Sequence, residues 1–379
     1  MTNPLRAVLI LGGLVAAAVS LSRIGRAAEG RNLVTDEERQ KIEQAIPAKA
    51  PARPAKPRRL LIFDHNVGYG GHRSAAHANL AFTLMGKKTG AFEAVVRRDP
   101  AAFAAGSLKQ FDAVFFNNTV GNLFEDPGLR RNLLEFVSGG GGLMGVHGTT
   151  AAFTRWPGAH EDWPAFGEML GARGASHRDS DERVFIKIED PDHPLVRAFG
   201  GKGFEYRDEF FRVHEPYSRE KLRVLLSIDT QKTDLHQGQA RGQSERADND
   251  YALAWVRSWG KGRVFYCTIA HNPYVFWDPR MLEFYLAAAQ FVLGDIPADT
   301  TPSAKLPSAA RAVGAAERIV ARPAVELVPA IVAPERVGAV AGDENIVASL
   351  VHAENDSRPL CPPRGKVECP LFPGLFPGV

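Results

Sequence analysis

Residues 138–150 read Ser-Gly-Gly-Gly-Gly-Leu-Met-Gly-Val-His-Gly-Thr-Thr, and this stretch decides the fold. A helix-like run at residues 127–137 leads into the four glycines, which predict a tight turn. The short apolar run 143–146 follows, as expected for a buried strand, and it stops abruptly at His147. This order predicts an elbow that presents His147 at the C-terminal edge of a strand, where open α/β sheets bind ligands.

Short apolar strands alternate with helices on both sides of this stretch. Strands are expected at 60–63, 92–96, 113–116, 184–188, 204–211, 223–228, 253–256 and 264–269. Helices are expected at 162–170, at 280–293 and from Ser74, as the capping residue, to about Met85. The alternation favours an α/β fold in which a mostly parallel sheet is covered by helices on both faces.

The N-terminal segment has the composition of a targeting signal. Arg6 precedes an apolar stretch at residues 7–21, and small residues follow at Ala27 and Ala28. This order predicts a signal peptide over residues 1–28 and export to the periplasm or the outside of the cell. An uncleaved N-terminal anchor is the alternative interpretation.

The remaining parts of the chain divide into a linker, one domain and a tail. Residues 29–58 should hold a short helix, with Thr35 and Glu38 in a capping box, and then a proline-rich linker. The folded domain is expected at 59–297. Residues 298–379 are rich in Ala, Pro and Val without a sustained period, which predicts a disordered tail.

Composition excludes several classes of function. The net charge is +3 and basic residues are not clustered in the domain, so nucleic-acid binding is not indicated. No run beyond the signal segment approaches the length needed to span a membrane.

Cys267 lies in a strand-like run and should be a buried thiol. Cys361 and Cys369 lie in the tail, where a pairing could not stabilise the domain. The oligomeric state is left open.

Several short motifs along residues 58–295 occur in the order shared by one known family. They are 71–73 (GHR), 140–147 (GGGLMGVH), 163–171 with His177, 192–195 (DHPL), 208–210 (DEF), Ala254-Trp255, 260–266 (GKGRVFY) and His271. On this set the chain resembles the ThuA-like (trehalose-utilisation) proteins. The resemblance implies a flavodoxin-like, class I glutamine amidotransferase-like fold, which is a three-layer sandwich.

The resemblance also implies a role in bacterial carbohydrate use, with a 3-keto-disaccharide or related sugar as the candidate substrate. Amidotransferases of this fold carry a cysteine at the elbow, whereas this chain has His147 there. No cysteine lies near an expected elbow, so glutamine hydrolysis through a thiolate is excluded.

Polar side chains follow four of the expected strands, and in a parallel sheet these ends meet over one crevice. We expect His147, Glu209 and His271 to be catalytic, since an imidazole shuttles protons near neutral pH and a carboxylate orients it. Glu209 is favoured over its neighbour because adjacent strand residues point to opposite faces. The expected substrate-binding residues are His72, Arg73, Asn117, Asn118, Trp163, His177, Asp208 and Trp277. The alternative is that each polar residue caps its own turn.

The histidines also raise the question of a metal ion. His65, His72, His147, His177 and His271, together with Glu209, include enough ligand types for zinc or another divalent cation. No tight spacing on one helix supports such a site, so the sequence assigns no metal ligand. No cofactor is firmly implied, and a divalent metal ion is left open.

Three classes of function follow from these observations. The first is an exported enzyme that acts on a carbohydrate as a hydrolase, lyase or isomerase by His–carboxylate acid–base catalysis. The second is a non-catalytic sugar-binding module with the same crevice. The third is a cell-surface interaction protein that uses the basic linker and the proline-rich tail.

Overall fold

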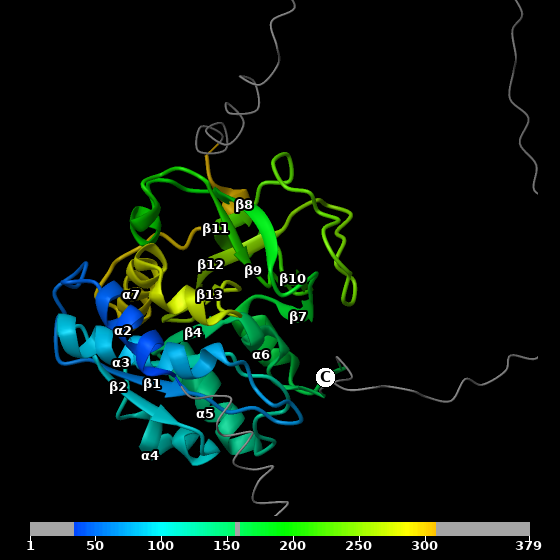
Figure 1. The fold of residues 1–379 in the computed structure, drawn as a ribbon. Helices are drawn as coiled ribbons and strands as arrows, with labels where there is room; N and C mark the ends of the chain where they lie inside the picture. The colour runs from blue at the N-terminus through cyan, green and yellow to red at the C-terminus, as the bar shows by residue number, and fades with distance from the viewer. Residues whose placement is uncertain (1–33, 156–159, 308–379) are drawn as a thin grey trace, which may run out of the picture. The chain divides into compact units, whose positions relative to one another are not determined.

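The computed structural model of the chain describes residues 34–155 and 160–307, and a nine-stranded sheet forms its middle layer (Figure 1). In spatial order the strands are β2 (Glu93–Arg97), β1 (Arg59–Phe63), β3 (Ala113–Asn117), β4 (Gly142–Val146), β13 (Gly262–Cys267), β12 (Ala252–Trp259), β11 (Arg223–Ile228), β8 (Glu182–Ile188) and β9 (Phe204–Asp208). Neighbours from β2 to β13 pair in parallel. From β13 to β9 every pair is antiparallel.

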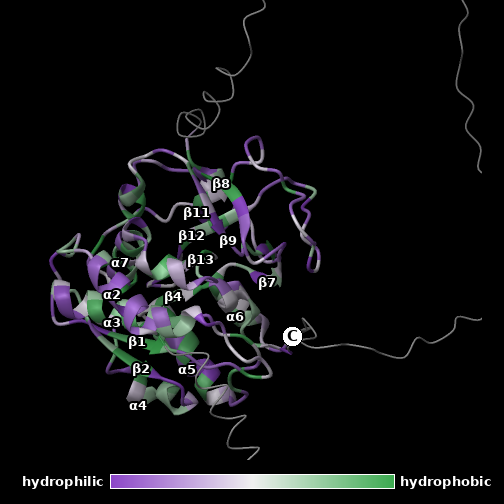
Figure 2. Cartoon of the chain, viewed as in Figure 1, coloured by the Kyte–Doolittle hydropathy of each residue, from purple (hydrophilic) through white to green (hydrophobic). Residues whose placement is uncertain are grey.

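Helices cover both faces of the sheet. Side chains alternate between the two faces along each strand, and buried apolar residues occur on both. In β1, Leu60 and Ile62 pack under α2 (Asp36–Ala45), α3 (Ser74–Thr89) and α7 (Pro279–Leu293). Leu61 and Phe63 pack on the other face, under α5 (Pro127–Ser138) and α6 (Pro164–Leu170). Figure 2 shows mostly hydrophobic central strands and a mostly hydrophilic α2. The predicted three-layer α/β fold is confirmed.

Smaller elements connect these layers. They are η1 (Pro100–Phe103), α4 (Ala105–Leu108), η2 (His147–Ala151), β5 (Thr154–Arg155), β6 (His160–Glu161), β7 (Arg173–Ser176), η3 (Pro194–Phe199), β10 (Arg212–His214), η4 (Pro273–Trp277) and η5 (Ser303–Lys305). β10 pairs with β7, and β5 pairs with β6. No helix within the described ranges is both long and apolar enough to cross a membrane.

Two local predictions need correction. Ser74 does not cap α3: it is the first residue of the helix, and its hydroxyl donates to the Ala270 carbonyl over 2.6 Å. Ser74 therefore ties α3 to the loop after β13. The strand expected at 204–211 ends at Asp208, and β10 begins at Arg212. Glu209 lies in the short connection between them.

The segment before the domain packs closely against it. The predicted capping box of α2 is confirmed, with Thr35 and Glu38 as its partners. The proline-rich linker contacts the domain directly. The Gln290 side chain accepts from the Ala52 amide (2.9 Å) and donates to the Ala52 carbonyl (2.7 Å). Such paired hydrogen bonds fix the extended backbone of the linker on α7.

Residues 298–307, beyond the expected end of the domain at 297, also contact the domain. The amide of Ser303 donates to the Leu222 carbonyl over 2.9 Å, and Arg223 forms an ion pair with Asp299 at 3.4 Å. Cys267 is fully buried, as expected, and burial raises its pKa to about 12. The predicted signal peptide, the rest of the tail, Cys361 and Cys369 lie outside the described residues.

Glu189, just after β8, gives a prediction for the pH dependence of stability. Burial alone would raise its pKa, but Arg219 at 3.0 Å, Lys187 at 3.4 Å and the Ser227 hydroxyl at 2.6 Å hold the pKa at about 2. A carboxyl with a lowered pKa in the folded state stabilises above its unfolded pKa, which is 4.5 here, and loses this contribution as the pH falls toward 2.

We expect Glu189→Gln to lower the free energy of unfolding near pH 7 by up to about 3 kcal/mol. The difference from the wild type should narrow as the pH falls below about 4.5. Urea unfolding at several pH values measures it. Glu205→Gln is the control, since Glu205 forms an exposed pair with Arg183 and should change stability by less than about 1 kcal/mol. A difference that stays constant with pH would contradict the prediction.

Candidate functional site

His147 stands on a sharp elbow directly after β4. Its φ of +41° lies in the left-handed region, which costs a residue with a side chain about 1–3 kcal/mol. The Thr149 hydroxyl closes the elbow, lying 2.8 Å from the carbonyls of both Phe116 and Val146. A Cβ at Gly145 would lie 2.8 Å from the Thr149 methyl, so this tight closure requires glycine there.

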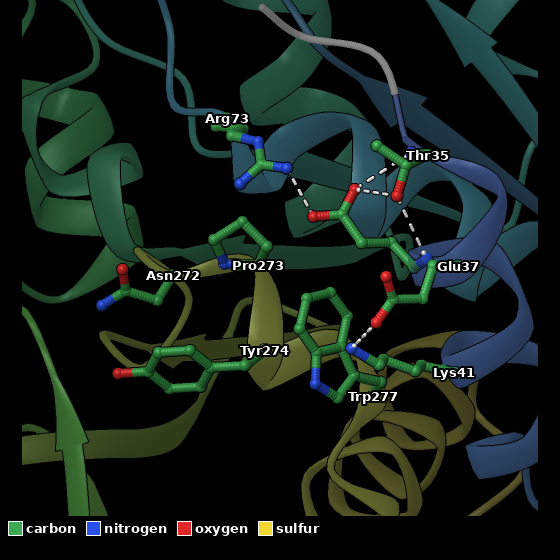
Figure 3. Close-up of a pocket in the computed structure, with 9 residues that line it drawn as sticks. Thr35, Glu37, Lys41, Arg73, Asn272, Pro273, Tyr274 and Trp277 are labelled. Carbon is green, nitrogen blue, oxygen red and sulfur yellow. Dashed lines mark hydrogen bonds and ion pairs between the residues drawn. The ribbon is translucent and has the colours of Figure 1, made fainter.

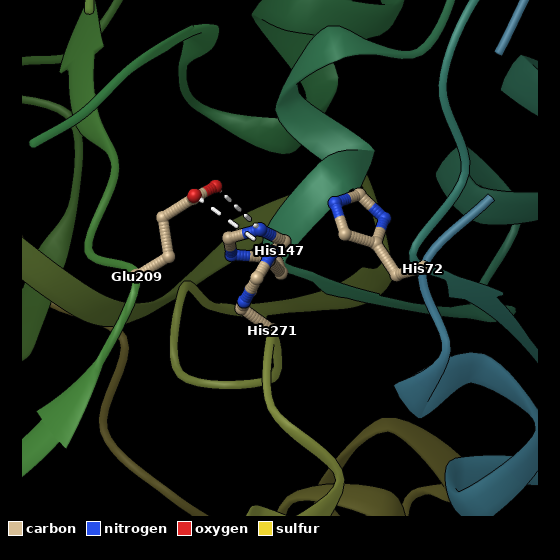
Figure 4. Close-up of side chains that lie close together, drawn as sticks. All are labelled: His72, His147, Glu209 and His271. Atoms are coloured by element: carbon tan, nitrogen blue, oxygen red, sulfur yellow. Dashed lines mark ion pairs between the residues drawn. The ribbon is translucent and has the colours of Figure 1, made fainter. Parts of the chain in front are cut away.

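Three further side chains meet His147 from separate segments of the chain (Figure 4). His72 comes from the loop between β1 and α3, Glu209 from the connection after β9, and His271 from the loop after β13. One nitrogen or oxygen atom from each of the four residues lies within 4.8 Å of the others. The three imidazole centroids are 4.8–5.3 Å apart. The structure thus brings four of the predicted site residues into one cluster.

The Glu209 carboxylate lies among three histidines. One oxygen is 3.4 Å from His147 Nε2, and the other is 3.2 Å from His177 Nδ1 and 3.7 Å from His271 Nε2. His147 is fully buried, whereas the side chains of His177 and His271 are 24% and 23% exposed. The cluster therefore has a buried floor at His147 and an accessible side at His177 and His271.

The second ring nitrogen of His147, Nε2, faces a carboxylate. Its Nδ1 lies 2.9 Å from the Thr268 carbonyl, which is an acceptor, so Nδ1 carries the hydrogen. Nε2 is buried and has no hydrogen-bond partner within the described ranges, although Glu209 is near. An unprotonated Nε2 and a carboxylate oxygen would repel each other, so this contact calls for a proton or a cation between them.

The electrostatics of the cluster favour neutral side chains at His72, His177 and His271 around a charged carboxylate. Burial, followed by the neighbouring His147, lowers the pKa of His271 to about 4 and that of His72 well below its usual range. Burial also lowers the pKa of His177. Burial alone would raise the pKa of Glu209, but the surrounding histidines, His147 first, lower it. Neutral imidazole and ionised carboxylate are the forms that bind metal ions.

Four predicted substrate-binding residues have structural contacts instead. Trp163, 9% exposed, packs on Phe153 and Phe166 in the apolar core. The Asn117 amide donates to the Ala75 carbonyl and to the Asn79 side chain, and the Asn118 amide lies 3.3 Å from the Ala270 carbonyl. Asp208 accepts from the backbone amides of His271 (3.1 Å) and Asn272 (2.9 Å). Asn118 and Asp208 thus contact the backbone of residues 270–272, next to and including His271.

Asp208 holds the loop that carries His271. It is fully buried, and burial raises its pKa to about 7, although His147 and the amides of residues 271 and 272 act in the opposite direction. The side-chain amide of Asn272 adds a third hydrogen bond, at 2.9 Å. Asp208 therefore positions His271 through the backbone. The opposite-face argument for Glu209 does not apply, because the strand ends at Asp208.

Arg73 and Trp277, also predicted to bind substrate, line a separate pocket (Figure 3). Its volume is about 400 Å³, and it lies between α2 and the segment 272–277. Arg73 and Asn272 follow His72 and His271 directly in the chain, so the pocket begins one residue from two members of the cluster. The other lining residues are Thr35, Glu37, Glu38, Lys41, Pro273 and Tyr274.

Sequence reasoning missed three contributors to the cluster. The Tyr69 hydroxyl lies 3.2 Å from His72 Nε2, the Thr268 carbonyl orients His147, and the Phe211 ring lies 4.0 Å from the His147 ring between centroids. Tyr69 could have been found from its place in the same glycine-rich loop as His72. A backbone carbonyl and a ring below the site leave no signal in a sequence. His65, a candidate metal ligand from the sequence, is not part of the cluster.

The comparisons with known proteins agree with the fold. The model of the ThuA family, described as trehalose utilisation, matches residues 59–292, which is more than half of the chain. A ThuA-like protein from Bacteroides uniformis ATCC 8492 is 21% identical, with a TM-score of 0.51 over 67% of this chain and 99% of that chain. One from Parabacteroides merdae ATCC 43184 is 16% identical, with a TM-score of 0.45 over 65% and 96%. No curated protein matches the chain.

Proposed function

Because the chain belongs to the ThuA family of trehalose-utilisation proteins, we propose that it is a metal-dependent enzyme that processes a carbohydrate. The observation that carries the proposal is the convergence of His72, His147 and His271 on the Glu209 carboxylate, with His147 Nε2 buried 3.4 Å from it. A divalent cation at this place would satisfy both atoms together with His72 and His271.

The ligand set suits zinc or a related divalent ion. Three imidazoles and one carboxylate match the ligand types of such sites, which also keep room for water or substrate in catalysis. The Thr268 carbonyl and the Tyr69 hydroxyl support His147 and His72 from behind, as outer groups commonly do for metal-binding histidines. When bound, the cation would act as a Lewis acid toward a substrate oxygen.

The residues around the ligands supply the remaining chemistry. His177 lies 3.2 Å from Glu209 and is partly exposed, so its imidazole can exchange a proton with a substrate and with solvent. Phe211 packs against both this ring and His147, and the apolar contact excludes water from the floor of the site. A 3-keto-disaccharide or a related sugar offers the oxygen-rich, neutral surface that this arrangement fits. Hydrolysis, elimination and isomerisation are the reaction classes in question.

We expect the purified protein to bind about one divalent ion per chain. Elemental analysis and titration of the chelator-treated protein with zinc, manganese and cobalt measure this. At 100 times its dissociation constant, the bound ion should stabilise the fold by about 2.7 kcal/mol, which a thermal shift detects. Chelation should abolish turnover in a screen of disaccharides and their keto derivatives.

Two variants make the metal experiment specific. Glu209→Gln should weaken metal binding by more than about 10-fold, because a neutral amide replaces the carboxylate. His236→Ala should bind as the wild type does, since the side chain of His236 is 72% exposed and outside the cluster. Failure of the wild type to bind any of the three ions would overturn the proposal.

We also propose that the protein is exported, on the support of residues 1–28. Fractionation of cells that express the full chain, with mass measurement of the mature N-terminus, tests this. Cleavage after Ala27 or Ala28 is the expected result. A cytoplasmic, uncleaved chain would contradict it.

A further inference from the structure

The pocket between α2 and the segment 272–277 has balanced charge and an aromatic wall. Glu37 and Glu38 contribute two acidic groups, while Lys41 and Arg73 contribute two basic ones. These groups pair with one another: Lys41 with Glu37 at 2.6 Å, and Arg73 with Glu38. The pocket is therefore rich in hydrogen-bonding groups without a net charge, which favours a neutral polar ligand over a phosphate or a cation.

Helix α2, which forms one wall, is held firmly in place. Ile42 is fully buried in the core cluster that also contains residues of α3. Glu38 lies 3.1 Å from Nε2 of the buried His77 on α3. The capping box fixes the first turn of the helix. The wall is thus preformed, and it comes from residues that precede the segment matched by the family model, which begins at residue 59.

The opposite wall presents two aromatic rings. Trp277 and Tyr274 are both half-buried, and the Lys41 ammonium lies 5.6 Å from the centre of the Trp277 ring (Figure 3). Sugar rings stack their C–H faces on such aromatic surfaces, while their hydroxyls bond to polar groups at the edge. A volume of about 400 Å³ lies at the lower end of the range of ligand pockets, about 300–1,000 Å³.

We infer that this pocket is a second saccharide subsite, which holds one sugar unit of a disaccharide or longer chain while a neighbouring unit reaches the histidine cluster. The inference rests on the proposed function for the identity of the ligand. It adds that α2, outside the family segment, selects the length of the substrate. The close connection through Arg73–His72 and Asn272–His271 keeps the two sites in a fixed relation.

Equilibrium binding of disaccharides and of glucose tests the inference. The probes are trehalose, maltose, cellobiose and sucrose, measured by calorimetry on metal-loaded and metal-free protein. At least one disaccharide should bind the wild type more tightly than glucose. Trp277→Ala and Lys41→Ala should weaken that disaccharide by about 10-fold or more and about 3-fold respectively, with glucose binding changed by less than about 2-fold.

A matched tryptophan separates a subsite from a general loss of packing. Trp259 is also half-buried and has a cation over its ring, with Arg257 5.1 Å from the centre, but it does not line the pocket. Trp259→Ala should leave the preference for the disaccharide unchanged. Trp277→Phe keeps most of the packing and should retain part of the affinity.

Each outcome decides the inference. It is overturned if no disaccharide binds more tightly than glucose, or if Trp277→Ala and Lys41→Ala keep the wild-type preference. Metal content, measured on the same samples, separates the two proposals. A chain that loads metal but shows no effect of the pocket variants disproves the subsite alone, whereas a chain that binds no metal disproves the proposed function.

Discussion

Replacing His147 with alanine is expected to abolish stoichiometric metal binding and to lower turnover by more than about 100-fold. This loss exceeds the one usual for a residue that only contacts a metal ligand. His147 is the buried floor of the cluster, and its Nε2 faces Glu209 at 3.4 Å. Removing it leaves His72, Glu209 and His271 without their central partner. Disaccharide affinity should change by less than about 3-fold, because the second sugar is held elsewhere. Elemental analysis, turnover and calorimetry on the same preparation measure the three quantities.

The glycine variant is the control for folding. At φ +41° glycine is unstrained whereas alanine is not, so His147→Gly should be more stable than His147→Ala by about 1 kcal/mol, while both lack the metal. A non-catalytic sugar-binding module would give the opposite pattern: affinity would fall in both variants and there would be no turnover to lose. That result would exclude the enzyme.

The second large effect is expected at the buried ion pair between Arg212 and Glu182. Two hydrogen bonds, of 2.5 and 2.6 Å, join the guanidinium to the carboxylate, and both side chains are at most 1% exposed. Glu182→Ala should lower the free energy of unfolding by about 3–5 kcal/mol, because it leaves a buried charge unpaired. Arg212 begins β10, three residues after Glu209, so the variant should also weaken metal binding.

Denaturant unfolding of a double-mutant cycle measures this effect. The combination Glu182→Leu with Arg212→Met should recover much of the lost stability, since apolar replacement of a whole buried pair is often neutral. Asp181→Ala breaks the exposed pair of Asp181 with Arg207 and should cost less than about 1 kcal/mol. Equal losses from the Glu182 and Asp181 variants would show that burial of the pair contributes nothing.

Much of the fold could be predicted because local patterns agree with the tertiary structure. The glycine run before residue 143 and the stop at His147 specified turn, strand and elbow, and the capping signals of α2 held. The antiparallel order from β12 to β9 could not be read in the same way. Antiparallel pairing depends on partners far apart in sequence, and buried strands look alike in either direction.

The histidines of the site could be predicted from the sequence, whereas the proposed metal site could not. Residues at strand ends, such as His147 and His271, could be placed at one edge by topology alone. No residue spacing in the sequence indicated the proposed metal site, because its four residues come from four separate segments. The burial of Trp163 and Asn117 could not be predicted, since a sequence pattern does not separate an aromatic or amide side chain in a core from one in a binding site.

The four proposed metal ligands come from separate parts of the chain, which would constrain how the protein matures. The parallel strands β1 to β4 supply His72 and His147, but Glu209 and His271 follow β9 and β13. During synthesis from the N-terminus, a nascent chain shorter than 271 residues holds an incomplete coordination sphere, and long-range closure is the slow step for such topologies. If the proposed site binds a metal ion, full affinity requires that the last sheet strand, β13, is inserted between β4 and β12, so loading would mark the end of folding.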